Sequence, residues 1–267
     1  MIPLKDNIPS RTTPVVNYGL LVVCGVAFLL QLSVGSKAHE VVERYGMVPA
    51  RVTHPDQPVI VRRPVARLRE GILYRKEALA GPPFNPYLTL ITCMFLHGGW
   101  MHFVFNMLFL YIFGDNIEDR LGHLGYLAFY LIAGVLAGLA HLLSNPSSTT
   151  PTIGASGAIA GVMGAYFLLY PHARVLTVIW VFFFLEFIVL PAWLMLGLWF
   201  VMQLFQGSLA AATPGAGGVA WWAHIGGFAV GAGAVYALRG VGLIRRELPR
   251  AIPATGRIRA YRSRRPW

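Results

Sequence analysis

The sequence has few charged residues and few cysteines for its length. Lys, Arg, Asp and Glu make up 12% of its 267 residues, whereas soluble domains carry about a quarter. The hydrophobic share is 56% and the mean hydropathy is +0.58. This balance excludes an ordinary soluble domain and predicts one all-α polytopic membrane domain. The two cysteines, Cys24 and Cys93, lie in apolar runs, which excludes a disulfide framework and predicts small core residues.

Acidic residues are scarcer than basic ones, and the net charge is +11. A basic balance can indicate nucleic-acid binding, so its distribution matters. Nine of the 22 Lys and Arg lie in residues 239–267, and another nine lie in residues 35–86. Charge that flanks apolar runs is typical of a membrane protein in contact with anionic lipid, whereas a nucleic-acid groove interleaves basic and aromatic residues. We therefore expect membrane lipids as partners and no nucleic acid.

Long apolar runs predict a bundle of six transmembrane helices, because a helix needs about 20 apolar residues to cross the hydrocarbon core. The predicted spans are 15–34, 100–114, 124–143, 156–170, 190–204 and 221–238. Together they define a membrane domain over residues 15–238, which follows a polar segment at 1–14 and precedes a basic tail at 239–267. A cleavable signal peptide is the alternative interpretation of the first run. The length of that run and the lack of a small-x-small cleavage site favour a retained span.

The segments between the spans carry their own expectations. Residues 35–86 form a polar, proline-containing loop that we expect to be partly helical. Residues 87–95 are apolar but too short to span, and 174–188 read as an interfacial segment before the fifth span. Residues 115–120 form a charged turn, and the small residues at 207–219 predict a flexible loop.

Six spans place both termini on the same side of the membrane. The arginines that follow the last span place that side in the cytoplasm by the positive-inside rule. Residues 35–86 are also basic and would face outward, but loops of this length are translocated with little regard to charge. The lack of organelle-targeting features in residues 1–14 favours a bacterial plasma membrane.

Polar residues recur at one depth in alternate spans. With this topology the second, fourth and sixth spans all run inward, so their first turns share the outer level of the bilayer. Those turns contain His102 and Asn106, then Ser156, then His224. Polar groups in a bilayer are costly and face a protein interior or a water-filled cavity. The pattern predicts one cavity that is open to the outside.

Ser156 lies where a polar loop becomes a glycine-rich helix. Gly154 supplies the bend that exposes it, and further glycines let the fourth and sixth spans approach closely. These glycines are Gly157, Gly161, Gly164, Gly227 and Gly231. If the two glycine faces meet, His224 reaches Ser156 and can activate it as a nucleophile. No Asp or Glu lies at that level in the three spans, so a dyad is favoured over a triad.

Three groups near Ser156 are candidate donors to an oxyanion. The Ser156 backbone N–H lies at a helix N-terminus, where the first amides lack helical partners. The Asn106 side-chain amide and the His102 ring are the others, and donors of this kind stabilise a tetrahedral intermediate.

Three motifs carry a family resemblance: Gly-Ala-Ser-Gly at 154–157, Ala-His-Ile-Gly-Gly at 223–227, and the segment from His97 to Asn106. Together they resemble the rhomboid intramembrane serine proteases over roughly residues 84–238. A single G-x-S-G motif has little specificity, but three motifs in this order on the second, fourth and sixth spans are specific.

The resemblance implies that Ser156 is the nucleophile and His224 its general base. It further implies an oxyanion hole made by His102, Asn106 and the Ser156 amide. The implied substrates are single-span membrane proteins cleaved near their transmembrane segment, with no metal or cofactor. Residues 207–219 would be the cap over the site, and the fifth span the lateral gate.

Two departures from the family pattern stand out. Some members carry a Trp-Arg pair in the first loop, which is absent here, so the role of residues 35–86 stays open. Some carry a tyrosine one turn after the serine that packs on the histidine. Ala160 occupies that place, so another side chain must position His224.

Other function classes fit less well. A rhomboid-like pseudoprotease that binds and escorts membrane proteins is the main alternative, although such proteins typically lack the Ser156/His224 pair. No H-E-x-x-H motif and no intramembrane aspartate pair occur, which disfavours zinc and aspartyl proteases. No internal repeat suggests a transporter. No sequence feature defines an oligomeric state.

Overall fold

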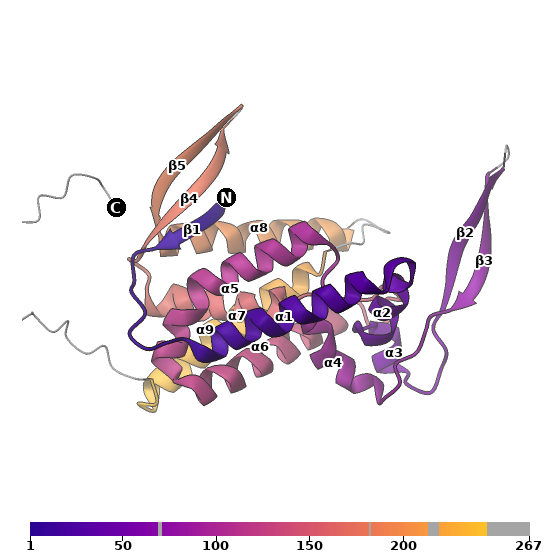
Figure 1. The fold of residues 1–267 in the computed structure, drawn as a ribbon, viewed down its shortest axis with the longest axis horizontal. Coiled ribbons are helices and arrows are strands. Elements are labelled where there is room, and N and C mark those ends of the chain that lie inside the picture. Colours follow the sequence, from indigo (N-terminus) through magenta and orange to yellow (C-terminus); the bar gives the residue numbers. More distant parts are fainter. Residues whose placement is uncertain (69–70, 182, 213–218, 245–267) are drawn as a thin grey trace, which may run out of the picture.

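The computed structural model describes residues 1–68, 71–181, 183–212 and 219–244. In this part of the chain, six helices of at least 14 residues form a bundle (Figure 1). They are α1 (Val15–Ser33), α5 (Trp100–Leu121), α6 (His123–Ser144), α7 (Ser156–Leu169), α8 (Ala192–Ala212) and α9 (Trp221–Gly240). Each begins within about two residues of a predicted span, which is the usual uncertainty of a helix boundary.

The helices of the bundle differ in how well they suit a lipid environment. By length and composition α1, α6 and α8 can each cross a membrane. The short helices η2 (Pro86–Leu88), α4 (Thr89–Thr92) and η3 (Cys93–Phe95) join α5 at an angle of 82°, and this bent pair passes the same test. Helix α7 has only 14 residues, of which 11 are buried. A short helix suffices there because other helices surround it.

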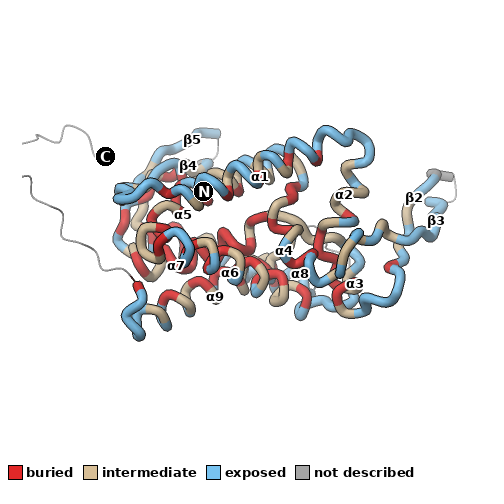
Figure 2. The backbone as a smooth tube through the Cα atoms, turned by 60° about the horizontal axis from the view of Figure 1, so that its bottom comes forward, coloured by how far each residue is buried: buried red, intermediate tan, exposed pale blue. Residues whose placement is uncertain are grey.

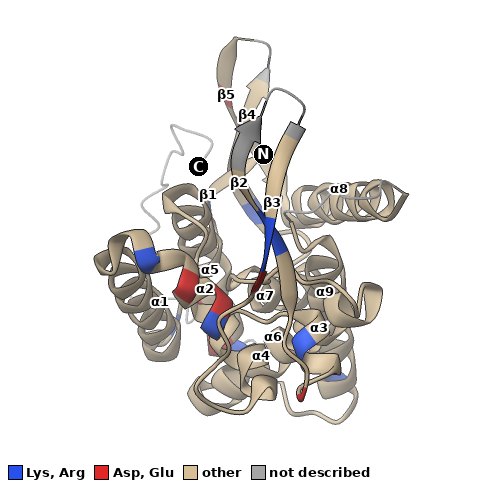
Figure 3. Cartoon of the chain, turned by 90° about the vertical axis from the view of Figure 1, so that its right-hand side faces the viewer, with Lys and Arg blue, Asp and Glu red and all other residues tan. Residues whose placement is uncertain are grey.

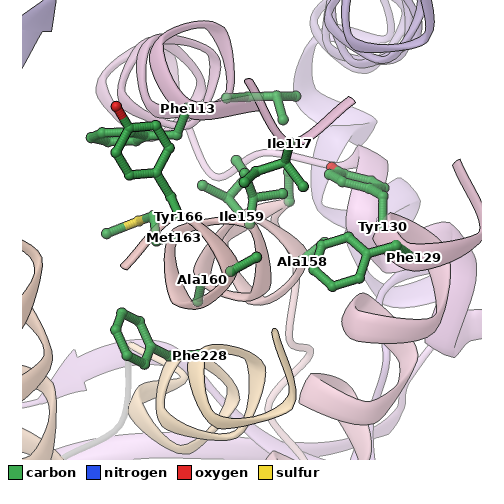
Figure 4. Packing of buried hydrophobic residues seen from close by; sticks show 14 of the residues in the cluster. Phe113, Ile117, Phe129, Tyr130, Ala158, Ile159, Ala160, Met163, Tyr166 and Phe228 are labelled. Atoms are coloured by element: carbon green, nitrogen blue, oxygen red, sulfur yellow. The ribbon is translucent and has the colours of Figure 1, made fainter. Parts of the chain in front are cut away.

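The core of the protein is built around α7 (Figures 2 and 4). Its buried side chains contact residues from three neighbouring helices. The labelled members of this cluster are Phe113 and Ile117 of α5, Phe129 and Tyr130 of α6, Ala158, Ile159, Ala160, Met163 and Tyr166 of α7, and Phe228 of α9. These contacts fix α7, and with it Ser156, at the centre of the bundle.

Helices α7 and α9 meet backbone to backbone. A Cβ on Gly227 would overlap the carbonyl oxygen of Gly157, and one on Gly231 would overlap that of Gly161. On the other side of α7, the methyl groups of Ala133 and Ala137 fill the space beside Gly161 and Gly157. Only glycine permits an approach this close.

Among the described residues five strands lie outside the bundle, and none of them was predicted. Strands β1 (Ile2–Asp6), β4 (Arg174–Val181) and β5 (Phe184–Pro191) form an antiparallel sheet in the order β1-β4-β5, while β2 (Ile60–Leu68) and β3 (Gly71–Ala78) form a hairpin. The prediction of an interfacial segment at 174–188 missed the β4–β5 hairpin. Its β-branched and aromatic residues favour strands.

The two hairpins project from the same side of the bundle, one near each end (Figures 1 and 3). Open sheet edges are not tolerated in lipid hydrocarbon, so both hairpins belong outside it. Residues 35–86 also contain η1 (Gly35–Lys37), α2 (Ala38–Tyr45) and α3 (Pro49–Thr53). The β2–β3 hairpin carries a cluster of cations: Arg62, Arg63, Arg75 and Lys76.

The prediction of a charged turn at 115–120 is wrong, because this segment is the last part of α5. The chain turns at Gly122, whose φ is +72°. The Glu118 carboxylate is fully buried and accepts hydrogen bonds from the backbone N–H groups of Val16 and Asn17, at 3.0 and 2.8 Å. A carboxylate at a helix N-terminus satisfies free amides and complements the helix dipole. The charged segment therefore anchors the start of α1.

The N-terminal segment is held at the same end of the bundle. Asp119 accepts hydrogen bonds from the backbone N–H groups of Arg11 and Thr12. In β1, the Asp6 carboxylate accepts a hydrogen bond from the Tyr166 hydroxyl of α7 at 2.5 Å. Burial raises the pKa of Asp6 to about 6, although the bond from Tyr166 opposes that shift.

The predicted loop at 207–219 and the basic tail at 239–267 are only partly covered by the described residues. Helix α8 continues to Ala212, so the first part of the predicted loop at 207–219 is helical, and residues 213–218 lie outside the described residues. Most of the basic tail, residues 245–267, lies outside them as well. The two cysteines are buried and unbonded to each other, as predicted.

The α7–α9 contact predicts a sharp difference between two glycines of α9. Replacing Gly231 with Ala forces its Cβ into the Gly161 carbonyl, and we expect the free energy of unfolding to fall by about 1–3 kcal/mol. Gly233→Ala is the matched control, because its Cβ would meet nothing within 4 Å. Thermal unfolding of both variants in detergent measures the difference. Equal stability of the two variants would contradict the packing described here.

Candidate active site

Ser156 is the first residue of α7, and a well-fixed loop leads into it. The backbone N–H of Gly154 donates to the Cys93 carbonyl at 2.9 Å. Thr152 exchanges two backbone hydrogen bonds with Met47, at 2.7 and 3.0 Å. Gly154 has a φ of +124°, a backbone conformation that residues other than glycine rarely adopt. These constraints set the direction in which the chain enters the helix and presents Ser156.

Ser156 and His224 are in direct contact. His224 lies in the first turn of α9, 68 residues further along the chain, and its Nε2 is 2.8 Å from the Ser156 Oγ. Both residues are half-buried. The close approach of α7 and α9 through their glycines brings the two side chains within this distance. A serine hydroxyl bonded to an imidazole nitrogen is the geometry of an activated nucleophile.

The opposite edge of the His224 ring contacts α8. The Nδ1 atom is 2.8 Å from Oε1 of Gln203, whose side chain is buried. The Trp199 ring lies one turn earlier on α8, with its centroid 5.9 Å from that of His224, and Trp221 approaches edge-on at 6.2 Å. Three side chains therefore surround the imidazole where Ala160 offers only a methyl group.

Sequence reasoning missed Gln203, although a signal was present. A glutamine inside an apolar span is costly unless it has a partner. Trp199 and Gln203 are four residues apart and so share one face of the helix. The groups that this helix face contacts are determined by the packing of α8 on α9.

The His102 ring lies against Gly154, two residues before the serine. Its Nδ1 accepts a hydrogen bond from the Gly98 backbone N–H at 3.1 Å. In a neutral imidazole the other nitrogen, Nε2, then carries the hydrogen. That nitrogen would lie 2.7 Å from a Cβ placed on Gly154, and the Ser156 Oγ would lie 3.6 Å from the same point. The Nε2–Cε1 edge of the His102 ring therefore faces Gly154, next to Ser156.

Asn106 is buried one turn below His102. Its side-chain amide donates to the His102 backbone carbonyl at 2.8 Å. One of its two amide hydrogens is thus used within α5, and the other has no acceptor among the described residues. The structure places Asn106 on the same helix face as His102, with one donor committed to the helix backbone.

His97 is held by its backbone. The Gln31 side chain of α1 accepts from the His97 N–H at 3.2 Å and donates to its carbonyl at 2.7 Å. The imidazole is buried next to His102, and its ring nitrogens have no hydrogen-bond partner among the described residues. Within the same residues, no group of three or more His, Cys, Asp or Glu side chains is arranged to hold a metal ion.

The fold and this site define a class: a polytopic helical membrane protein with a paired serine and histidine between its central helices. A family model described as Rhomboid domain matches residues 85–241, which is more than half of the chain. The chain belongs to the rhomboid family.

Several relatives support this assignment. RHOMBOID-like protein 12, mitochondrial, of Arabidopsis thaliana is 32% identical over 161 residues, which make up 54% of this chain and 44% of that protein. Rhomboid protease GluP of Bacillus subtilis is 41% identical over 81 residues, or 30% of this chain and 15% of that protein. Rhomboid protein 1, mitochondrial, of Saccharomyces cerevisiae is 32% identical over 93 residues, or 33% and 27%. The chain spans less than half the length of each of these relatives.

The contact between Gly154 and His102 predicts a selective loss of serine reactivity. Gly154→Ala places a methyl group against the His102 ring and moves it from the serine. We expect the rate at which a fluorophosphonate probe labels Ser156 to fall by about 10²-fold or more, as when an oxyanion donor is removed.

Gly99→Ala is the matched control for that experiment. Gly99 also has a positive φ, of +141°, but a Cβ there would meet nothing within 4 Å. A similar fall in both variants would mean that backbone strain, and not displacement of His102, causes the loss.

Proposed function

We propose that the protein is an intramembrane serine endopeptidase that cleaves single-span membrane proteins within or next to their transmembrane segment. The observation that carries this proposal is the 2.8 Å contact between Ser156 Oγ and His224 Nε2 in a half-buried site. The named protease activity of a relative, Rhomboid protease GluP, lends support.

The chemistry follows from the arrangement of donors and acceptors. His224 Nε2 takes the hydroxyl proton as the Ser156 oxygen attacks the peptide carbonyl carbon. The negative charge develops on the carbonyl oxygen, where the Ser156 backbone N–H and His102 Nε2–H can donate. The free hydrogen of the Asn106 amide is a third donor.

Two steps complete the reaction. The protonated His224 returns its proton to the nitrogen of the leaving amine as the C–N bond breaks, which leaves an acyl ester on Ser156. A water molecule, deprotonated by His224, then attacks the ester carbonyl, and the Ser156 oxygen leaves with the proton. Water can reach the pair because both residues remain partly exposed at the start of their helices.

The surrounding helices fit a substrate that arrives from the membrane. Helix α8 is the least buried of the three helices that can span alone, with 22% of its apolar window buried. It stands beside His224 and is the helix that family resemblance identifies as the lateral gate. Substrates are therefore proposed to be transmembrane proteins that approach through the lipid.

Cleavage of a fluorogenic transmembrane substrate by the purified protein tests the proposal. We expect Ser156→Ala and His224→Ala each to lower kcat by at least about 10³-fold, as for other serine nucleophiles and bases. Ser147→Ala and His39→Ala, two exposed positions, are matched controls that should retain activity. Equal cleavage by all the variants would refute the assignment. Labelling of Ser156 by a fluorophosphonate separates a protease from a pseudoprotease, which would remain unlabelled.

Orientation in the membrane is part of the proposal. We propose that both termini are cytoplasmic, in a bacterial plasma membrane, and that Ser156 lies near the outer surface. Among the relatives, Rhomboid protease GluP comes from a bacterium, and two others carry mitochondrial names.

Two single-cysteine variants test the orientation. Ser147→Cys, in the loop before α7, should react with a membrane-impermeant maleimide on intact cells, whereas His172→Cys, beyond α7, should react only after lysis. Both positions are exposed, and the two natural cysteines are buried. The reverse labelling pattern would invert the topology.

A further inference from the structure

Gln203 and Ser156 flank the His224 ring from opposite sides. The Ser156 Oγ lies 2.8 Å from Nε2, and the Gln203 Oε1 lies 2.8 Å from Nδ1. The exposed fraction of Gln203 is 5%. The buried residues of α8 are Ala192, Met195, Leu196, Gln203 and Gly207, so glutamine is the one polar side chain that this helix buries.

The protonation state of His224 explains why an amide oxygen belongs there. To accept the serine proton, Nε2 must carry a lone pair, so the hydrogen of the neutral ring must sit on Nδ1. Oε1 of Gln203 is an acceptor only, and it stabilises this tautomer and not the other. It also fixes the plane of the ring, so that Nε2 faces Ser156.

We propose that Gln203 is the positioning residue for His224, so that the Ser156–His224 pair is a dyad whose histidine is held by a third side chain. The inference rests on the proposed function. It names the side chain that positions His224, a role that the methyl group of Ala160 cannot fill. Gln203 acts through the histidine and does not itself contact the substrate.

The membrane setting explains why this third residue is neutral. An ionised carboxylate within an apolar helix carries a large desolvation penalty. An amide offers a carbonyl acceptor at a smaller penalty, and its hydrogen bond to His224 offsets part of that. When His224 becomes an imidazolium during the reaction, the same carbonyl dipole stabilises the Nδ1–H.

The groups that face His224 from the other elements are few. His102 on α5 and His141 on α6 are the titratable side chains that would act on its charge when they are protonated. Ser156, Trp199 and Trp221 contribute no charge. A carboxylate introduced at position 203 would therefore have no other acidic group to compete with at this ring, among the described residues that influence it.

Three variants test the role of Gln203 in the full-length protein. Gln203→Leu keeps the volume and removes the acceptor. We expect kcat for the transmembrane substrate to fall by about 10- to 100-fold with little change in KM, a part of the 10²–10⁴ that a positioned base supplies. Gln206→Leu is the matched control, the same change one turn further along α8. The Gln206 side chain makes no hydrogen bond among the described residues, so the kcat of this variant should match that of wild type.

Gln203→Glu provides a readout that a merely structural role would not move. A carboxylate beside Nδ1 favours the protonated ring. The acid limb of kcat against pH should therefore move to higher pH by about one unit. Wild-type rates in Gln203→Leu, or an unshifted profile in Gln203→Glu, would overturn the inference.

A measurement without turnover separates this inference from the proposed function. Nitrogen-15 NMR of histidine-labelled protein, with His224→Ala used for assignment, reports which ring nitrogen carries the hydrogen. We expect Nδ1–H in wild type and its loss in Gln203→Leu. If wild type cleaves no substrate but the Nδ1–H seen in wild type is lost in Gln203→Leu, the protease assignment fails and the positioning of His224 stands. If both proteins show Nε2–H, the positioning role is refuted whatever the activity.

Discussion

Close contact between two helix backbones is the constraint on which the rest of the structure depends. Helices α7 and α9 meet through Gly157, Gly161, Gly227 and Gly231, with no side chain between them. Because Gly157 lies against Ala223 and Gly227, this contact also sets the distance between the neighbouring residues Ser156 and His224. Backbone packing therefore brings Ser156 and His224 together. The hydrogen bond between their side chains follows from that packing and is not its cause.

The remaining elements keep this pair in place. Helix α5 contributes Phe113 and Ile117 to the core, and its charged end caps α1 through Glu118. The bend before α5 brings Cys93 against Gly154, so the loop that carries the serine is fastened to a different part of the chain. Longer helices thus surround α7, whose 14 residues are too few to cross a bilayer core alone.

Much of this could be predicted from the sequence, and the failures have physical causes. Long apolar runs and the depth of polar residues located the helices and the cluster around Ser156. Apolar runs leave strand and helix ambiguous, so the hairpin formed by β4 and β5 was missed. Asp115 to Arg120 are polar enough to suggest a turn, but the N-terminal segment covers their polar groups and lets the helix continue. The partner of Gln203 depends on helix packing, which no local pattern encodes.

The hydrogen bond between Gln203 and His224 crosses from an outer helix to an inner one. Only 22% of the apolar window of α8 is buried in the protein, whereas Ser156 begins α7, most of whose residues are buried. The orientation of the His224 ring therefore depends on where α8 lies, because a displacement of α8 from α9 would remove the partner of Nδ1. A single hydrogen bond thus couples the position of an outer helix to the direction in which an inner side chain faces.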